Sequence, residues 1–368
     1  MVALLEELVR SESPSLAPET HGRAVEILGA ELEALGFRVR RLPGRKTGDH
    51  LLARPRERPK GAPYQLLLGH LDTVWPVGTL DEMPVRREGE RLHGPGTYDM
   101  KGGLVQMLFA MKALEALSVT PGATPVVLVN SDEEIGSPES TRHLRNLARG
   151  ACRALVFEPS YGSEGRLKTA RKGVGRFELR ILGRASHAGL APERGVSAIL
   201  ELSHQVQRLF ELNDAERGIT VNVGTIDGGL RANVVAPEAG AVIEARVPTA
   251  GDAAEVERAI MGLEPVQEGI GIEVSGGFGR PPMERTERNR ELWEAAREAA
   301  GSLGLTLHEA AVGGASDGNT TSLHTATLDG LGPVGGDAHA AGEHVEVSGM
   351  VDRAALAALL IALPPQGD

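Results

Sequence analysis

Three short, mostly apolar runs constrain the fold of this chain more than any other feature of its sequence. They lie at residues 64–68, 125–129 and 153–157. Runs of this length are typical of strands that are buried on both faces of a sheet. Helical patterns near 101–117 and 138–149 separate the runs. This strand–helix alternation predicts an α/β domain with a mixed, largely parallel sheet.

The pattern changes after about residue 171. The next segments predict four strands and two helices, with the strands at 173–182, 219–227, 233–247 and 270–278 and the helices near 195–212 and 252–262. The helix–strand alternation then returns, with a helix at 287–302, a strand near 304–312 and a last helix at 349–363. We therefore predict one discontinuous domain, residues 1–171 and 284–368, interrupted by a small α+β domain at 172–283.

The composition excludes several classes of protein and of site. The net charge of -11 and the pI of about 5.6 argue against a nucleic-acid or membrane partner, which would need a basic face. Cys152 is the only cysteine, which excludes disulfides within the chain and cysteine-rich zinc sites. The first residues, MVALLEELVRSESPS, carry acids within their apolar run, so they predict an amphipathic helix and not a signal peptide. We expect a cytoplasmic protein.

Acidic and histidine side chains follow the apolar runs or occupy nearby glycine-rich segments. They are His70 and Asp72, Glu133 and Glu134, Glu158, Asp99 in GPGTYDMKGG, and His339 in GPVGGDAHAAGEHVE. In open α/β sheets, ligands bind outside the carboxyl ends of the strands. Imidazoles and carboxylates together suit zinc, or manganese or cobalt. Asp99 lies in a glycine-rich loop just before a predicted helix, where the backbone can approach closely, which suits a carboxylate shared by two cations.

The motifs GHLDTV, GTYDMKGG, DEEIGS and FEP occur in an order and spacing that resemble the M20 metallopeptidase family. This family contains glutamate carboxypeptidases, aminoacylases and succinyl-diaminopimelate desuccinylases. The sequences of these motifs most resemble those of the glutamate carboxypeptidase branch. The resemblance covers about residues 65 to 345. It implies a zinc-peptidase catalytic domain whose inserted domain is a ferredoxin-like lid that also forms a homodimer.

The implied activity is hydrolysis of the amide bond of a small N-acyl amino acid or peptide with a free C-terminal carboxylate. Glutamate is the leading candidate for the C-terminal residue, and an N-acetyl or N-succinyl amino acid deacylase of the same family is the alternative. The resemblance also implies two divalent metal ions, with zinc the leading candidate and cobalt or manganese possible.

The resemblance assigns roles to individual residues. His70, Asp99 and Glu158 would hold one metal ion, and Asp99, Glu134 and His339 would hold the other. Glu133 would be the general base for the water that bridges the ions. Asp72 would accept the second ring N–H of His70 and fix its tautomer.

Further residues match the family's substrate positions. His187 would reach across the dimer to stabilise an oxyanion, and Asn233 and Arg280 would contact the substrate. Arg280 suits a carboxylate, because a guanidinium pairs with it through two hydrogen bonds. Arg246, Arg166 and Ser316 are further candidates for substrate binding. Two departures, Met100 after Asp99 and SDGN in the late loop, concern substrate identity and not the predicted ligands.

Two other classes of function compete with this interpretation. Ser316 lies in a G-x-S-x-G pattern followed by Asp329, Asp337 and His339, the chain order of an α/β-hydrolase triad. That interpretation leaves the acidic clusters unexplained. A non-catalytic binding homologue is the other alternative, although such a protein would have no need of Glu133 or His187. Individually, His187 also fits a turn cap beside Gly189, and Arg280 fits a surface arginine.

Overall fold

The computed structural model describes residues 1–59 and 61–365, and the chain divides into two compact units. The first unit comprises Met1–Thr169, Arg285–Val312 and Ser316–Asp368. The second unit comprises Ala170–Glu284 and Gly313–Ala315. The second unit contains the predicted insertion at 172–283, and residues 313–315, far along the chain, also belong to it.

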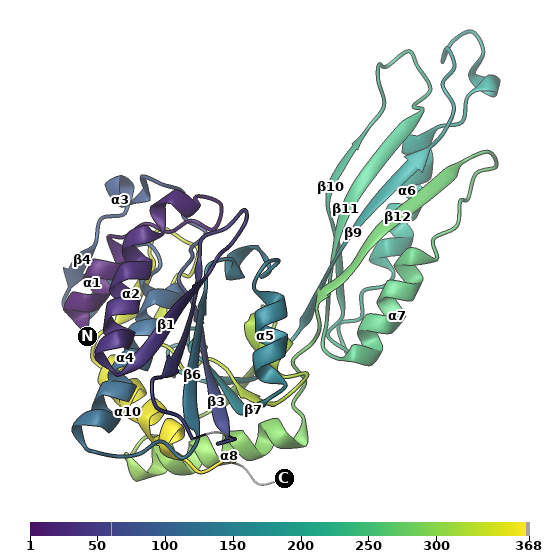
Figure 1. Ribbon diagram of the computed structural model, residues 1–368. Helices are drawn as coiled ribbons and strands as arrows, with labels where there is room; N and C mark the ends of the chain where they lie inside the picture. The colour runs from purple at the N-terminus through teal and green to yellow at the C-terminus, as the bar shows by residue number, and fades with distance from the viewer. Residues whose placement is uncertain (60, 366–368) are drawn as a thin grey trace. The chain divides into compact units, whose positions relative to one another are not determined.

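The first unit is built on a six-stranded sheet in the order β1-β2-β6-β3-β7-β14 (Figure 1). Its strands are β1 (Phe37–Leu42), β2 (His50–Pro55), β3 (Tyr64–His70), β6 (Thr124–Asn130), β7 (Ala151–Val156) and β14 (Ala326–Leu328). Strand β3 runs parallel to β6 and β7, and β14 is parallel to β7, whereas β1 and β2 pair antiparallel. The predicted mixed, largely parallel sheet is confirmed. The apolar runs did not reveal β1, whose sequence FRVRRL contains three arginines.

Helices cover both faces of this sheet. They are α1 (Val2–Val9), α2 (Gly22–Ala34), α4 (Gly102–Ala116), α5 (Thr141–Ala148), α8 (Glu287–Ser302) and α10 (Gly349–Ala362). Leu67 of β3 belongs to the core shared with α2, α4 and α10, whereas Leu66 and Leu68 pack in the core shared with α5 (Figure 1). Neighbouring residues of a strand point to opposite faces, so the apolar run is buried on both sides.

Shorter elements connect this framework. The helical ones are η1 (Pro18–Thr20), α3 (Thr79–Glu82), η2 (Thr97–Lys101), η3 (Glu133–Ile135) and α9 (Asp317–Thr321). A two-stranded sheet joins β8 (Leu167–Arg171) and β13 (Glu309–Val312), so the strand predicted near 304–312 begins late. A four-stranded sheet contains β4 (Arg86–Glu88), β5 (Arg91–His93), β15 (Gly335–Gly336) and β16 (His344–Glu346). Within residues 1–59 and 61–365, we find no helix that is long and apolar enough to span a bilayer.

The second unit has the chain order β9-α6-β10-β11-α7-β12, with the short turn η4 (Pro192–Arg194) before α6. The elements are β9 (Gly173–Leu182), α6 (Ala198–Phe210), β10 (Thr220–Gly228), β11 (Glu238–Val247), α7 (Ala250–Met261) and β12 (Gly271–Arg280). Its sheet is antiparallel in the order β10-β11-β9-β12, with α6 and α7 packed against it (Figure 1). This is a ferredoxin-like arrangement. The strand predicted at 233–247 begins only at Glu238, directly after Pro237, which has no N–H for a strand ladder.

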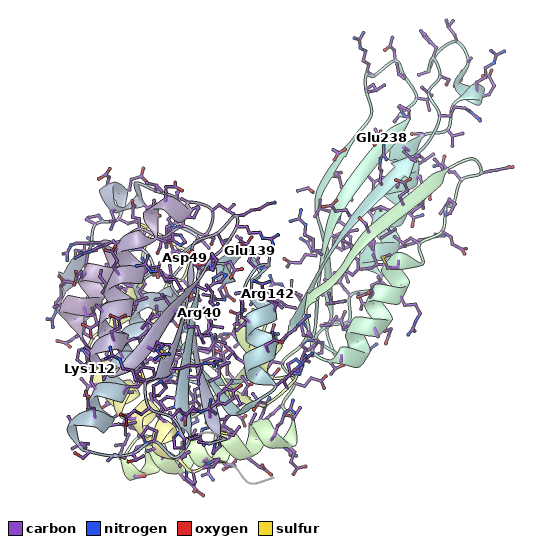
Figure 2. All side chains as sticks on the ribbon, viewed as in Figure 1. Arg40, Asp49, Lys112, Glu139, Arg142 and Glu238 are labelled. Carbon is purple, nitrogen blue, oxygen red and sulfur yellow. The ribbon has the colours of Figure 1, made fainter. Side chains whose placement is uncertain are left out.

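Surface carboxylates tie neighbouring segments together within each unit (Figure 2). Glu139 accepts hydrogen bonds from the backbone N–H groups of Arg45 (2.7 Å) and Lys46 (3.2 Å), which holds the loop between β1 and β2 near the start of α5. In the second unit, Glu238 of β11 accepts a 2.6 Å hydrogen bond from Arg180 of β9. The exposed ion pair between Arg180 and Glu238 contributes little to stability.

Two helical glycines allow a direct test of how closely α4 packs against the end of β7. A Cβ atom on Gly103 would lie 1.9 Å from the backbone oxygen of Phe157, whereas a Cβ on Gly29 of α2 would meet nothing within 4 Å. We expect Gly103→Ala to lower the free energy of unfolding by about 3 kcal/mol, because a backbone atom must move. Gly29→Ala should raise it by about 0.5–1 kcal/mol. Urea denaturation measures both, and equal effects would contradict the close packing.

Candidate metal centre

The predicted site residues emerge together where the parallel strands end. His70 is the last residue of β3, Glu133 and Glu134 lie in the turn η3 after β6, and Glu158 follows β7 by two residues. Strand β3 lies between β6 and β7, and His70 is in register with Asn130, the last residue of β6. The carboxyl ends of the three strands therefore deliver these side chains to one edge of the sheet.

Asp99 lies between two imidazoles. Its Oδ1 is 3.2 Å from Nε2 of His70, and its Oδ2 is 3.4 Å from Nε2 of His339. The loop before Asp99 contains Gly94 and Gly96 at φ angles of 150° and 74°, which favour glycine. One carboxylate thus faces both histidines, through a different oxygen for each.

Each imidazole also faces a second carboxylate. Oε1 of Glu158 is 3.5 Å from Nε2 of His70, and Oε2 of Glu134 is 3.2 Å from Nε2 of His339. A tetrahedral zinc ion with bonds of 2.0–2.1 Å keeps neighbouring ligand atoms about 3.3 Å apart. The four nitrogen–oxygen distances, between 3.2 and 3.5 Å, fit that spacing better than the most common N–H···O distance of about 2.9 Å.

The charges in this cluster favour a cation. Burial by itself lowers the pKa of His70, but the carboxylates of Asp72, Asp99 and Glu158 raise it well above its usual range. Hydrogen bonds to Asp99 and Glu134 likewise raise the pKa of His339. Burial opposes ionisation of Asp99, yet the two histidines hold its pKa far below the ordinary value. The carboxylates therefore stabilise positive charge at both Nε2 positions, and metal binding displaces protons from such ligands.

Glu134 provides a separate indication. Its Oε1 is buried and accepts no hydrogen bond from the residues in the ranges 1–59 and 61–365. Burial raises the pKa of this carboxyl above its ordinary value. Buried polar atoms are rarely left without a partner. The oxygen-rich donor set and this unpaired oxygen fit a bound divalent cation.

The carboxylate of Glu133 lies close to His70 and Glu158. A carboxylate oxygen of Glu133 and ligand atoms of His70 and Glu158 all lie within 4.8 Å of one another. His70, Asp99 and Glu134 form a second group by the same measure. Glu133 and Glu134 are neighbours in the chain, yet they belong to different groups, which is compatible with different roles.

Asp72 differs in part from the prediction. The nearest acceptor to Nδ1 of His70 is the backbone oxygen of Asp72 at 3.0 Å, and the Asp72 carboxylate lies at 3.4 Å. That carboxylate accepts hydrogen bonds from the backbone N–H groups of Glu133 and Glu134, each at 3.2 Å. Burial opposes its ionisation, but the contacts with His70 hold its pKa below the usual range. Asp72 therefore orients His70 and also fixes the turn that carries both glutamates.

The N-terminal segment supports this loop, which the sequence analysis did not foresee. Ser15 Oγ donates to Oδ2 of Asp72 at 2.6 Å, and Ser13 Oγ donates to the backbone oxygen of Leu71 at 2.6 Å. Nζ of the buried Lys101 donates to the backbone oxygen of Ser11 at 2.8 Å. The run SESPS contains these serines, but a pairing across some 57 residues leaves no local pattern to read.

Two predicted substrate contacts lie together in the second unit. The exposed His187 accepts a 3.1 Å hydrogen bond at Nδ1 from the N–H of Gly189. The backbone of His187 forms an isolated antiparallel β-bridge with Val234. The backbone oxygen of Asn233 accepts a 3.0 Å hydrogen bond from Ala188. Both side chains are therefore presented from paired loops. Arg280 is half-buried at the end of β12.

Arg246 and Arg166 both have hydrogen-bond partners within the protein. Arg246 donates from Nε to Glu244 (2.8 Å) and from Nη1 to the backbone oxygen of Gly313 (2.9 Å). Arg166 donates to Glu164 at 2.7 Å, two residues away. These partners occupy part of the donor set of each guanidinium, and the roles of Arg246, Arg166 and Arg280 in substrate binding stay predictions.

Ser316 is fully buried, and its geometry favours a structural role. It is the N-cap of α9, where its Oγ accepts from the N–H of Gly318 at 3.0 Å and donates to Asp329 at 2.5 Å. A nucleophile must instead be exposed and next to a base. His339 faces Asp99 and Glu134. These contacts do not support a serine hydrolase, and the substrate contact of Ser316 stays a prediction.

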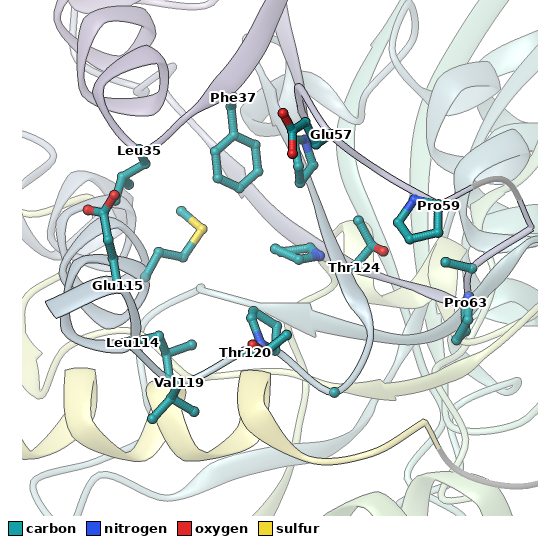
Figure 3. A pocket seen from close by; sticks show the side chains of 16 residues that line it. Leu35, Phe37, Glu57, Pro59, Pro63, Leu114, Glu115, Val119, Thr120 and Thr124 are labelled. Atoms are coloured by element: carbon teal, nitrogen blue, oxygen red, sulfur yellow. The ribbon is translucent and has the colours of Figure 1, made fainter. Parts of the chain in front are cut away.

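A pocket of about 450 Å3 lies at the other end of the sheet in the first unit. Thr124 at the start of β6 and Pro63 just before β3 line it, together with Phe37 and the carboxylates of Glu57 and Glu115 (Figure 3). Substrates of open α/β sheets bind at the carboxyl ends of the strands. This pocket is therefore separate from the candidate metal centre.

The chain is similar to known proteins in sequence and in fold. Residues 66–363 match peptidase family M20/M25/M40. Carboxypeptidase G2 of Pseudomonas sp. (strain RS-16) is 32% identical over 98% of this chain and 88% of that protein. A tripeptidase structure from Staphylococcus aureus aligns with a TM-score of 0.79 at 22% identity, covering 98% of this chain and 96% of the other. An M20 family metallo-carboxypeptidase structure from Sulfolobus solfataricus aligns with a TM-score of 0.76 at 19% identity and 99% coverage of both chains.

Proposed function

Because the chain belongs to peptidase family M20/M25/M40 and is a hydrolase of that family, we propose that it is a two-metal carboxypeptidase. Its substrate would be a small N-acyl amino acid or peptide with a free C-terminal carboxylate. One observation carries the proposal: the Asp99 carboxylate lies between His70 and His339, each of which faces a further carboxylate.

The chain's residues define two positions for divalent ions. His70, Asp99 and Glu158 would hold one ion, and Asp99, Glu134 and His339 would hold the other. When bound, such ions lower the pKa of a water to about 7 and polarise an amide carbonyl. The same nitrogen and oxygen donors accept zinc, cobalt or manganese, with zinc the leading candidate.

The protein's own groups would move the proton and orient the ligands. Glu133 would accept a proton from the attacking water on its carboxylate and return it to the nitrogen of the leaving amine. Both acceptors of Asp72 face Nδ1 of His70, which keeps the proton on Nδ1 and leaves the lone pair of Nε2 for a metal ion. Glu133 is a candidate base because its carboxylate lies near the ligand atoms of His70 and Glu158.

Substrate recognition would come from the second unit. Arg280 is the candidate for the C-terminal carboxylate, since a guanidinium forms two parallel hydrogen bonds with that group. His187 is the candidate for stabilising the oxyanion across a dimer, and Asn233, on the paired loop, is the candidate for a further contact with the substrate. The similarity to carboxypeptidase G2 supports a carboxypeptidase over a deacylase, and glutamate remains the leading C-terminal residue.

Homodimerisation through the second unit stays a prediction. Strand β10 is at one edge of the sheet, and Ile226 on it is 65% exposed. Ile199, Leu200 and Phe210 on α6 are each about half exposed. Exposed apolar side chains beside an open sheet edge favour an interface between proteins.

A substrate panel tests the proposed function. We expect hydrolysis of acyl-glutamates and peptides with C-terminal glutamate, loss of activity with EDTA, and recovery with zinc, cobalt or manganese. Acyl-glutamate amides should react at least about 100-fold more slowly, because a charge-assisted pair with the carboxylate is lost. A preference for N-acetyl or N-succinyl amino acids of other types would favour the deacylase. Activity that persists after complete metal removal would overturn the proposal.

A further inference from the structure

Glu343 is a buried carboxylate that accepts four hydrogen bonds beside the candidate metal centre. It is 1% exposed. Its Oε1 accepts from the backbone N–H groups of Tyr98 and Asp99, each at 3.0 Å. Its Oε2 accepts from the N–H of Gly96 at 2.9 Å and from the indole N–H of Trp75 at 2.7 Å. Glu343 lies in the segment GPVGGDAHAAGEHVE that contains His339, but the sequence pattern assigns no role to it.

The contacts of Glu343 define the backbone around Asp99. This backbone has no regular ladder of its own, because Asp99 and Met100 have non-helical φ and ψ angles within η2. Its N–H groups converge on one carboxylate, and converging backbone N–H groups form a binding site for an anion. Asp99 can turn one oxygen to each histidine only while its Cα and Cβ stay in place. Glu343 fixes the N–H attached to that Cα.

Glu343 also joins three segments that carry site residues. Trp75 follows Asp72 by three residues, and Glu343 itself follows His339 by four. The backbone oxygen of Glu343 accepts a further hydrogen bond, 3.2 Å long, from the N–H of Gly94. A single side chain thus holds the loops of Asp72, Asp99 and His339 against one another.

We propose that Glu343 is the positioning residue of the metal centre, which sets the Asp99 carboxylate between His70 and His339. The inference rests on the proposed function only in taking Asp99 as a metal ligand. Glu343 does not itself face a metal position. Glu343 acts through the backbone of the loop that carries Asp99, the shared ligand. Replacing Glu343 should therefore weaken metal binding in a protein that is still folded.

Cobalt titration of the metal-free full-length protein tests this proposal. In Glu343→Gln the new amide presents an N–H2 group to two of the N–H donors, so half of the contacts become repulsive. We expect cobalt affinity to fall about 10- to 100-fold, the usual effect of removing a group that orients a ligand. We also expect the visible absorption of the bound cobalt to change, because Asp99 no longer holds its orientation.

Glu201→Gln is the matched control. Glu201 is also fully buried and accepts hydrogen bonds from the backbone N–H groups of Val266 (2.8 Å) and Gln267 (3.0 Å), but within the second unit. Its loss should lower the unfolding temperature of the metal-free protein as Glu343→Gln does. Cobalt affinity and absorption should stay unchanged. A purely structural role for Glu343 would make the two variants behave alike.

Trp75→Phe serves if Glu343→Gln fails to fold. It keeps the aromatic packing and removes one donor from Glu343, so we expect cobalt to bind about three- to tenfold more weakly, the effect of one hydrogen bond. Wild-type cobalt affinity in every folded variant would overturn the role of Glu343 and leave the proposed function intact. A wild-type protein that binds no cobalt would overturn the proposed function itself.

Discussion

Glu133→Gln should lower kcat about 1,000-fold while the protein still binds its full complement of metal. The amide has nearly the shape of the carboxylate but cannot accept a proton, and general-base catalysis contributes about 100- to 10,000-fold. The carboxylate of Glu133 lies near the ligand atoms of His70 and Glu158, whereas that of the next residue, Glu134, faces His339. Because the substitution leaves the predicted ligands in place, KM should change little.

Steady-state kinetics together with metal analysis by mass spectrometry measures this effect. Glu139→Gln is a suitable control, since Glu139 bonds to the backbone of Arg45 and Lys46 and to no predicted site residue (Figure 2). It should keep kcat within about twofold, as surface substitutions commonly do. If Glu133→Gln retained wild-type turnover, another group would have to act as the base.

Asp99→Asn should have the second large effect, loss of both metal ions. Asp99 is the only carboxylate that faces both His70 and His339 within the described chain. An asparagine keeps one oxygen, replaces the other with an N–H2 group and removes the negative charge. Each metal position therefore loses affinity, and kcat/KM should fall about 10,000-fold, which corresponds to several kcal/mol of lost transition-state stabilisation.

Equilibrium dialysis against zinc, followed by metal analysis, checks this expectation. The wild type should bind two ions per chain and Asp99→Asn fewer than one. Asp132→Asn is the control, because the buried Asp132 bonds to the N–H groups of Glu139 (2.7 Å) and Ser140 (3.0 Å) and to no predicted ligand. It should destabilise the protein without changing the number of ions bound. Two tightly bound ions in Asp99→Asn would exclude Asp99 as the shared ligand.

The sequence predicts the core of the first unit because local patterns determine it. Apolar runs too short for helices form β3, β6 and β7, and the longer segments between them form α4 and α5. Once these strands are parallel and adjacent, residues just past their carboxyl ends must meet. His70, Glu133, Glu134 and Glu158 gather for that reason, and their joint position follows from strand order alone.

Other parts of the site depend on contacts between distant segments and leave no local pattern. Ser15 reaches Asp72, and Glu343 reaches the Asp99 loop, through hydrogen bonds between residues 57 and 244 positions apart. Strand β1 is rich in arginine, because it is an edge strand with exposed positions. Ser316 lies in the G-x-S-x-G pattern of a nucleophilic serine. Its buried contacts with Gly318 and Asp329 nevertheless give it the geometry of a helix N-cap.

The most direct measurement is anomalous diffraction at the zinc edge from a crystal of the zinc-loaded protein. We expect two peaks, one on each side of the Asp99 carboxylate, the first contacting His70 and Glu158 and the second contacting Glu134 and His339. The separation should be about 3.5–4 Å, as in other two-metal hydrolytic sites. A map with no zinc peak among these five side chains would contradict a two-metal site.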